Sequence, residues 1–328
     1  MKQFWKEAGL AVILGMLMPA VILHIVAVSS HHHAAKLPNI PISTDYELEL
    51  IEIPVLHPDG TVEKMALDTY LTGVLLAEMP ASFQVDALMA QAVVARTYAL
   101  RCHDGKSKHD EAAVCMDSAC CQGYCSGDDY LKKGGKSGDL KKVNSAIRMT
   151  KNLVLTYRDE LIDATYFSCS GGSTEDAVAV WGTDIPYLRA TDSPGEEDAS
   201  HYTDSVTFSA NELAERLNLT SSDDPTAWFG EVTYTAGGGV DEILICGVPF
   251  GGTELRKLLD LRSTAFTVTV VGDCVTFHTR GFGHRVGMSQ YGAEAMAASG
   301  SNFEEILYHY YHGTQLKQYV IDKKESVG

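Results

Sequence analysis

Glu78 is the carboxylate whose surroundings best suit acid–base chemistry. Residues 67–79 carry apolar side chains at helical spacing, and Pro80 ends the pattern just after Glu78. The negative end of a helix dipole and apolar neighbours both disfavour an ionised carboxylate, so we expect the pKa of Glu78 to be raised. A carboxyl group that keeps its proton at neutral pH can act as a general acid. On this segment alone, a carboxylate that simply faces water is the better-supported interpretation.

The next segment places polar side chains on a helix that is otherwise apolar. Residues 85–101 are rich in Ala, Leu and Met, and they include Gln91, Arg96 and Tyr98. Polar groups on a buried helix need partners. Gln91 and Tyr98 are seven residues apart and share one face. They either hold neighbouring segments together or line a polar cleft beside Glu78, and the spacing allows both.

A third candidate is the glycine-rich segment 280–292. It contains four glycines among aromatic and polar residues, and His284, Gln290 and Tyr291 offer hydrogen bonds. Closely spaced glycines at a helix start indicate backbone that approaches another group. A dinucleotide fingerprint is excluded, because the glycine spacing and the strand–turn–helix context are wrong. The segment Ser170-Gly171-Gly172 alone predicts only a turn.

The elements that position these residues mix strands and helices from residue 47 to residue 322. Helices are predicted at residues 67–79, 85–101, 139–151, 289–298 and 302–311. Hairpins are predicted at 48–65 and 153–168, and a long loop at 103–138. Residues 205–276 predict an α+β subdomain. The expected fold class is α+β: a helical catalytic region with short β-hairpins and an appended α+β lobe.

Composition narrows the possible partners. The chain has 328 residues, 45% of them apolar, which is ordinary for a folded protein. Its net charge is −17, and the one lysine-rich stretch, at 132–142, is short. Nucleic acid is therefore not an expected partner, because phosphate binding needs a concentrated basic surface. Any anionic substrate has to be met by local positive charges.

The N-terminal segment predicts a membrane anchor. Residues 8–28 carry no charged side chain and are long enough to span a bilayer as a helix. Basic residues within 1–7 place that end in the cytoplasm and the rest of the chain outside. A cleaved signal peptide, ending near Ala27-Val28-Ser29, is the alternative, but its apolar region would be unusually long. Residues 29–46 are expected to form a polar tether.

Taken together, these segments resemble the SpoIID/LytB family, of the stage II sporulation protein D type. The resemblance lies in Ala77-Glu78-Met79-Pro80, Gln91–Tyr98, Thr165-Tyr166-Phe167, Ser170-Gly171-Gly172, Val180-Trp181-Gly182, Pro186-Tyr187-Leu188, Gly283-His284 and Val286–Ala293. The matching blocks run in order from about Leu48 to Leu316, so chance is a poor explanation.

The resemblance implies lytic transglycosylation of peptidoglycan glycan strands, with Glu78 as the single catalytic acid/base. Such an enzyme needs only one carboxyl group, because the sugar's own 6-hydroxyl replaces water, whereas ordinary glycosidases use two. The substrate-binding residues that it implies are Gln91, Arg96, Tyr98, Ser170, Gly171, His284, Gln290 and Tyr291. The implied partners are stem-peptide-free glycan, a sporulation amidase and a membrane scaffold protein of engulfment. The implied location is the mother-cell membrane, facing the septal wall.

One residue departs from the family pattern. Where the family usually has Gly-His-Gly-Val-Gly, this chain has Gly283-His284-Arg285-Val286-Gly287. A guanidinium here adds bulk and charge near the expected cleft. Arg285 either contacts an anionic sugar substituent or points outward.

Five of the eight cysteines fall between Cys102 and Cys125. The set His109, Cys115, Cys120 and Cys121 resembles the zinc site of some clostridial members of the family, which carry His at the position of Cys120. Zinc accepts Cys or His at tetrahedral positions, and full coordination by protein makes such a site structural, with no part in the chemistry. Disulfides, for instance between Cys115 and Cys125, are the alternative, and Cys102 and His103 add ambiguity. For Cys169, Cys246 and Cys274 we expect buried thiols outside any site.

Two other functions compete with a transglycosylase. A non-catalytic wall-binding protein that modifies an amidase also binds glycan, but it should be indifferent to the loss of Glu78. A zinc hydrolase is disfavoured, because closed thiolate-rich sites are seldom catalytic.

Overall fold

The computed structural model describes residues 51–220 and 224–320. The predicted cytoplasmic segment 1–7, anchor 8–28 and tether 29–46 lie outside these residues. Within the described part, no helix is long and apolar enough to cross a membrane.

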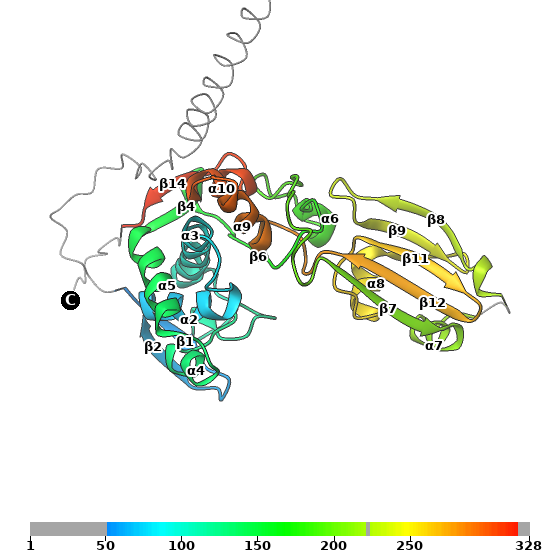
Figure 1. Cartoon of the computed structure of the whole chain (residues 1–328), viewed down its shortest axis with the longest axis horizontal. Coiled ribbons are helices and arrows are strands. Elements are labelled where there is room, and N and C mark those ends of the chain that lie inside the picture. The colour runs from blue at the N-terminus through cyan, green and yellow to red at the C-terminus, as the bar shows by residue number, and fades with distance from the viewer. Residues whose placement is uncertain (1–50, 221–223, 321–328) are drawn as a thin grey trace, which may run out of the picture. The chain divides into compact units, whose positions relative to one another are not determined.

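The described residues form a mixed α+β fold, as expected, in which a helical region carries most of the candidate site (Figure 1). Its N-terminal part comprises β1 (Glu52–Leu56), β2 (Val62–Ala66), α2 (Leu67–Glu78), α3 (Val85–Arg101), η1 (Cys102–Lys106), β3 (Val114–Cys115), α4 (Gly127–Lys132), α5 (Ser137–Met149), β4 (Leu153–Tyr157), β5 (Glu160–Leu161), β6 (Tyr166–Phe167) and α6 (Ala177–Trp181). Its C-terminal part comprises β13 (Met288–Ser289), α9 (Gln290–Ala298), α10 (Phe303–Tyr310) and β14 (Gln315–Gln318).

Helix α3 is the centre of this region. Its residues from Ala87 to Leu100 are all buried, so every face of the helix is covered. It packs against α2, α5, β4, α9 and α10, and these neighbours surround it in Figure 1. The largely apolar sequence at 85–101 therefore predicts a core helix correctly, because a helix with apolar residues on nearly every face is buried on all sides.

Short strands bring distant segments of the chain together. The C-terminal strand β14 pairs antiparallel with β4, and β4 pairs with β5. Strands β13 and β6 pair in parallel, with Met288 opposite Tyr166. The glycine-rich segment therefore lies beside the segment around residue 166, although they are far apart in sequence.

The second region, here called the lobe, runs from β7 to β12. Its elements are β7 (Thr203–Ser209), α7 (Ala210–Arg216), η2 (Pro225–Ala227), β8 (Phe229–Tyr234), β9 (Val240–Ile245), β10 (Val248–Gly251), α8 (Gly252–Leu258), β11 (Phe266–Val271) and β12 (Cys274–Arg280). They form two antiparallel sheets, ordered β10-β9-β8 and β11-β12-β7. The lobe has its own hydrophobic core, in which the Phe277 ring contacts those of Phe208, Phe229 and Phe266.

Most predicted elements agree with the structure to within a few residues, and two do not. The expected loop 103–138 contains the strand β3 and the helix α4, whose N-cap Ser126 accepts a hydrogen bond from the Asp129 amide. The expected hairpin 153–168 is short, because β5 has only two residues and Tyr166–Phe167 pairs with β13 instead. The pairing of Tyr166–Phe167 with β13 joins segments that are far apart in the sequence, so residue spacing could not reveal it.

Candidate functional site

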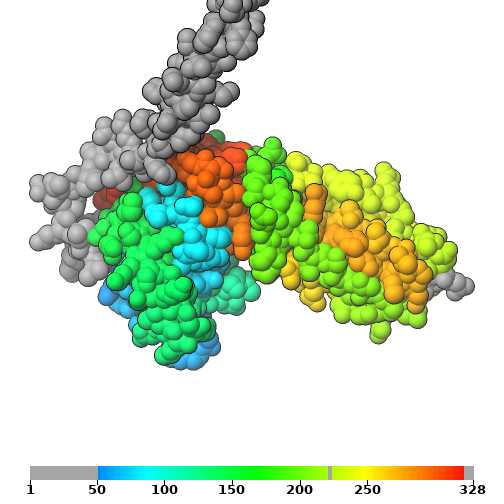
Figure 2. Space-filling model, viewed as in Figure 1, coloured from blue at the N-terminus to red at the C-terminus, as the bar shows by residue number. Residues whose placement is uncertain are grey.

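A cleft of about 620 Å³ lies against the carboxyl end of α2. Glu78 lines it together with the segment that follows α3 and the segment around Tyr166. Trp181, His284 and the lobe residue Arg256 complete part of the wall. Figure 2 shows the surface hollowed between the teal segment after α3 and the green and yellow surface of the lobe. The cleft is large enough for sugar units rather than a single small ion.

Glu78 is held at both carboxylate oxygens. The backbone amide of Gly123 donates to its Oε1 at 2.6 Å, and the side-chain amide of Gln290 donates to its Oε2 at 3.4 Å. A Cβ atom at Gly123 would lie 2.9 Å from Oε1, so glycine allows the close approach. The half-buried carboxyl group thus has a fixed position, which is what proton transfer to a bound sugar needs.

The buried Tyr70 and the half-buried Tyr166 fix the loop that carries Gly123. The Tyr70 hydroxyl donates to the side-chain oxygen of Gln122 at 3.3 Å, and the Gln122 amide donates to the Tyr166 hydroxyl at 3.2 Å. Burial raises the pKa of Tyr70 and of Tyr166, with a smaller contribution from the charge of Glu78. Both phenols therefore stay neutral, and they hold the loop through hydrogen bonds rather than charge.

His284 stands in an aromatic wall of the cleft. Its ring centroid lies 5.6 Å from that of Phe167 and 5.4 Å from that of Trp181. Burial, helped by the charge of Arg256, lowers the pKa of His284 to about 4. Its Nδ1 accepts a hydrogen bond from the Val286 amide at 3.1 Å, so the neutral ring carries its proton on Nε2. His284 is thus a neutral donor at physiological pH.

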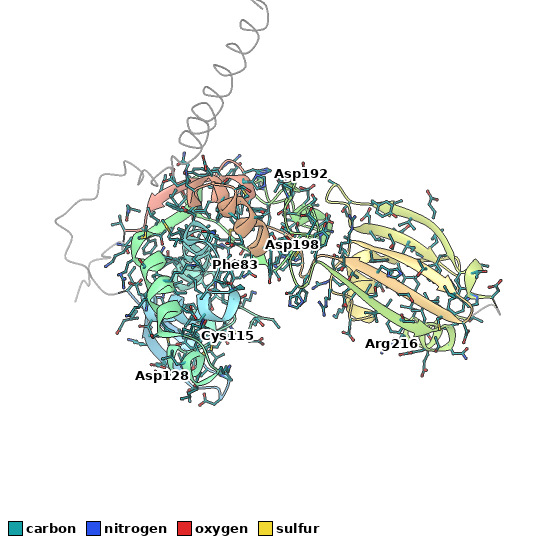
Figure 3. The ribbon with its side chains drawn as sticks, in the orientation of Figure 1. Phe83, Cys115, Asp128, Asp192, Asp198 and Arg216 are labelled. Carbon is teal, nitrogen blue, oxygen red and sulfur yellow. The ribbon has the colours of Figure 1, made fainter. Side chains whose placement is uncertain are left out.

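A metal centre fits the cysteine loop beside the cleft. His109, Cys115, Cys120 and Cys121 bring one ligand atom each to within 4.8 Å of one another. The Nε2 atom of His109 lies 3.4 Å from the Cys121 sulfur and 3.7 Å from the Cys120 sulfur. About 3.6 Å separates nitrogen and sulfur in a tetrahedral zinc site, so these distances match. Figure 3 labels Cys115 within the helical region.

The structure resolves the other ligand choices for this loop. Cys102, His103 and Cys125 do not join the cluster in the part of the chain that the structure describes. Cys115 and Cys125 form no disulfide, and the Cys125 sulfur contacts the Ser126 carbonyl oxygen instead. The four residues singled out in the sequence are the ones that could hold a metal.

Comparison with known proteins decides the family. Residues 58–157 match the family model described as stage II sporulation protein. The chain is 37% identical over 274 residues to stage II sporulation protein D of Bacillus subtilis (strain 168), covering 82% of this chain and 79% of the relative. The chain belongs to the SpoIID family. The corresponding protein of Bacillus amyloliquefaciens is 35% identical over the same shares. An amidase enhancer of Bacillus subtilis is 29% identical, over 76% of this chain but only 40% of that protein.

Three of the residues that the SpoIID pattern assigns to substrate line the cleft or touch Glu78. Tyr98 and His284 are in the wall of the cleft, and Gln290 hydrogen-bonds to the catalytic candidate. Tyr291 packs edge-on against Phe83, which Figure 3 labels, at 5.1 Å between ring centroids.

Two SpoIID residues of α3 lie in the core instead of the cleft. The Gln91 side chain is fully buried, and its amide makes no hydrogen bond to the described residues. Arg96 is buried as well, and its guanidinium donates to the carbonyl oxygens of Ile147, Thr150 and Leu153. Arg96 therefore joins α3 to the end of α5 and to the start of β4.

Ser170 and Gly171 hold a segment next to the cleft through backbone contacts. The buried Glu196 carboxylate accepts from the amides of both residues, at 2.6 and 3.2 Å. Gly171 has φ +75°, and a Cβ there would lie 2.7 Å from the Arg280 backbone. This contact seats the strand end that leads into Phe282 and His284. Neither residue lines the cleft.

Arg285, the departure from the SpoIID pattern, neither contacts the cleft nor points outward. It is 1% exposed and forms an ion pair with Glu175 at 2.9 Å. Its guanidinium also donates to the carbonyl oxygens of Ser170, Ser173 and Gly237. Gly237 precedes β9, so Arg285 ties the glycine-rich segment to the lobe.

Sequence reasoning missed several residues of the site. Gly123 and Gln122 follow the metal ligands directly, but nothing in their spacing pointed to Glu78. Trp181 was part of a matching motif without a role, and Arg256 lay in the lobe, where no chemistry was expected. Cys274 is exposed and Cys246 half-buried, contrary to the buried thiols expected, whereas Cys169 is fully buried.

Proposed function

We propose that the protein is a lytic transglycosylase that cleaves the glycan strands of peptidoglycan after an amidase has removed the stem peptides. The observation that carries this proposal is the carboxyl group of Glu78, which is held at both oxygens in a cleft large enough for sugar units. Membership of the SpoIID family supports a role in sporulation.

The chemistry needs two proton transfers at one carboxyl group. Protonated Glu78 gives its hydrogen to the bridging oxygen as the bond from that oxygen to the anomeric carbon breaks. The resulting carboxylate then takes the proton of the sugar's 6-hydroxyl, whose oxygen bonds to the same anomeric carbon. The product is an anhydro ring, Glu78 recovers its proton, and no water is consumed.

The other cleft residues bind and orient the strand. Trp181 and Phe282 are partly exposed aromatic side chains in the wall, and such rings stack on the apolar faces of sugars. The neutral ring of His284 completes this wall between Phe167 and Trp181.

We propose zinc as the ion of the His109 cluster, with a structural role. Zinc when bound would staple the loop between η1 and α4, because four protein ligands leave no open position. The four ligands would hold the loop whose next residues, Gln122 and Gly123, position Glu78.

We also propose that the chain acts at the membrane that faces the septal wall, in engulfment, beside an amidase and a membrane scaffold protein. The N-terminal apolar segment and the family support this setting. An amidase-modifying role is the second candidate, favoured by the 29% identity to an amidase enhancer.

The test compares two carboxylates of the cleft. Asp163 also lines it, 3.8 Å from the Arg101 guanidinium. Peptide-free glycan is incubated with wild type, Glu78→Gln and Asp163→Asn, and products are identified by mass spectrometry. We expect anhydro ends from wild type and Asp163→Asn and none from Glu78→Gln. Anhydro ends from Glu78→Gln would refute the proposal, and intact glycan with wild type, together with stimulated amidase, would favour the second candidate.

A further inference from the structure

The guanidinium of Arg256 lies where partial burial makes an unpaired positive charge unfavourable. It belongs to α8 of the lobe and lines the same cleft as Glu78. Its side chain is half-buried, and loss of surrounding water lowers the pKa of its guanidinium below the ordinary value. Within residues 51–220 and 224–320, no acidic side chain forms an ion pair with it. A half-buried charge without a partner calls for a compensating group.

The positive charges of the other cationic residues in the cleft are less unfavourable, because each has a partner or is exposed to water. Arg101 lies 3.8 Å from Asp163, so a carboxylate already faces it. Lys108 donates to the Cys120 carbonyl oxygen at 2.5 Å, and Lys106 is exposed to water. Arg256 alone among these four combines partial burial with the lack of an acidic partner.

Among the described residues, no acidic group contributes to the shift of the Arg256 pKa, whose cause is burial. The charge of Arg256 helps to lower the pKa of His284 to about 4, so the imidazole beside it is neutral. Trp181, the next part of this wall, is neutral as well. An anion that compensates Arg256 therefore has to come from a molecule in the cleft.

The geometry of the guanidinium favours a carboxylate. The Nε–H of Arg256 is used, because it donates to the Arg262 carbonyl oxygen at 3.3 Å. That hydrogen bond orients the planar group and leaves the two terminal nitrogens available. Two parallel N–H donors match the two oxygens of a carboxylate.

We propose that Arg256 is a specificity residue that binds the free carboxylate of an acidic sugar in the glycan strand. The proposal rests on the glycan-cleaving function proposed above. In peptidoglycan this carboxyl group is an uncharged amide while a stem peptide is attached, and it becomes an anion once the peptide is removed. The lobe thereby selects peptide-free strands by charge.

Local positive charge also explains how an acidic protein binds an acidic strand. The chain carries −17 overall, yet Arg101, Lys106, Lys108 and Arg256 outnumber Glu78 and Asp163 in the cleft. Clefts lined by one sign of charge concentrate ligands of the other sign.

The experiment measures binding without cleavage. In the Glu78→Gln background, affinity is measured for peptide-free glycan and for the same glycan with its carboxyl groups converted to neutral amides. Arg256→Ala should weaken binding to the acidic glycan about tenfold, the loss expected for a hydrogen bond between charged groups. Its affinity for the amidated glycan should equal that of the parent. Lys257→Ala is the matched control, because Lys257 is the exposed neighbour on α8 and does not line the cleft.

Equal affinities of Arg256→Ala and its parent for the acidic glycan would overturn the proposal, as would an equal loss on both glycans. Arg256→Lys keeps the positive charge but loses the two parallel N–H donors of the guanidinium. Its affinity for the acidic glycan should lie between those of the parent and of Arg256→Ala, and its affinity for the amidated glycan should equal that of the parent. Thermal melting of each variant shows whether it folds. Because the parent variant is inactive, these affinities stay interpretable even if wild type releases no anhydro ends, so the two proposals fail separately.

Discussion

Gly123→Ala is the substitution that most directly tests how Glu78 is held. The new Cβ would lie 2.9 Å from Glu78 Oε1, closer than ordinary packing allows. Gly123 has no positive φ, so alanine causes no backbone strain, and the atom that must move is the tip of a flexible side chain. We therefore expect normal folding with a displaced carboxylate.

The size of the effect follows from the hydrogen bond that is disturbed. The Gly123 amide donates to Oε1 at 2.6 Å, and its bond to the carboxylate that forms as Glu78 gives up its proton contributes about 1.5–3 kcal/mol. If that energy positions Glu78 for proton transfer, its loss slows cleavage about ten- to hundredfold. The assay is the initial rate of anhydro-end release from peptide-free glycan.

Gly138→Ala is the matched control for this test. Gly138 also lacks a positive φ, and no atom lies within 4 Å of its added Cβ. It should cleave glycan at the wild-type rate. A rate for Gly123→Ala within twofold of wild type would show that the amide does not position the carboxylate.

Three further predictions concern stability. The pKa of His284 is lowered from 6.5 to about 4, so the unfolded chain binds more protons between these values. Stability is therefore complete above pH 6.5 and falls by roughly 3 kcal/mol toward pH 4. Urea melts over this range should show that dependence, and it should be weaker in His284→Phe. Removal of metal by a chelator, or Cys115→Ser, should lower the melting temperature, and elemental analysis should find one zinc per wild-type chain. Arg285→Gly should cost about 3–5 kcal/mol, because it strands the buried Glu175 carboxylate, and a second change, Glu175→Gln, should recover part of that loss. An Arg285→Gly melt equal to wild type would contradict the buried ion pair.

The sequence predicts those parts of the fold whose causes are local. Helix α3 was predicted with the bounds that it has, because apolar residues dominate nearly every face of the segment. The start of the lobe helix α7 also has a local cause, because the Ser209 hydroxyl accepts a hydrogen bond from the Glu212 amide. The strand pair β13–β6 was not predicted, because a parallel two-residue pair leaves no periodic signal.

The candidate site was predicted to the extent that each residue carries its own chemistry. The four residues of the cluster were predicted from their resemblance to a zinc site of the family, and the structure brings their ligand atoms together. Arg96 and Arg285 were misassigned or left open, because a buried arginine that binds carbonyl oxygens cannot be told in sequence from one that binds substrate. Gly123 acts through its backbone amide, which every residue except proline possesses. Its role therefore cannot be predicted from the residue type.

The central claim is that one carboxylate cleaves the strand without water. Its most direct test is cleavage of peptide-free glycan by the wild-type protein in water labelled with heavy oxygen, followed by mass spectrometry of the new ends. We predict ends that contain no label and are one water lighter than hydrolysed ends. Incorporation of one labelled oxygen at each new end would show a hydrolase and contradict the role assigned to Glu78.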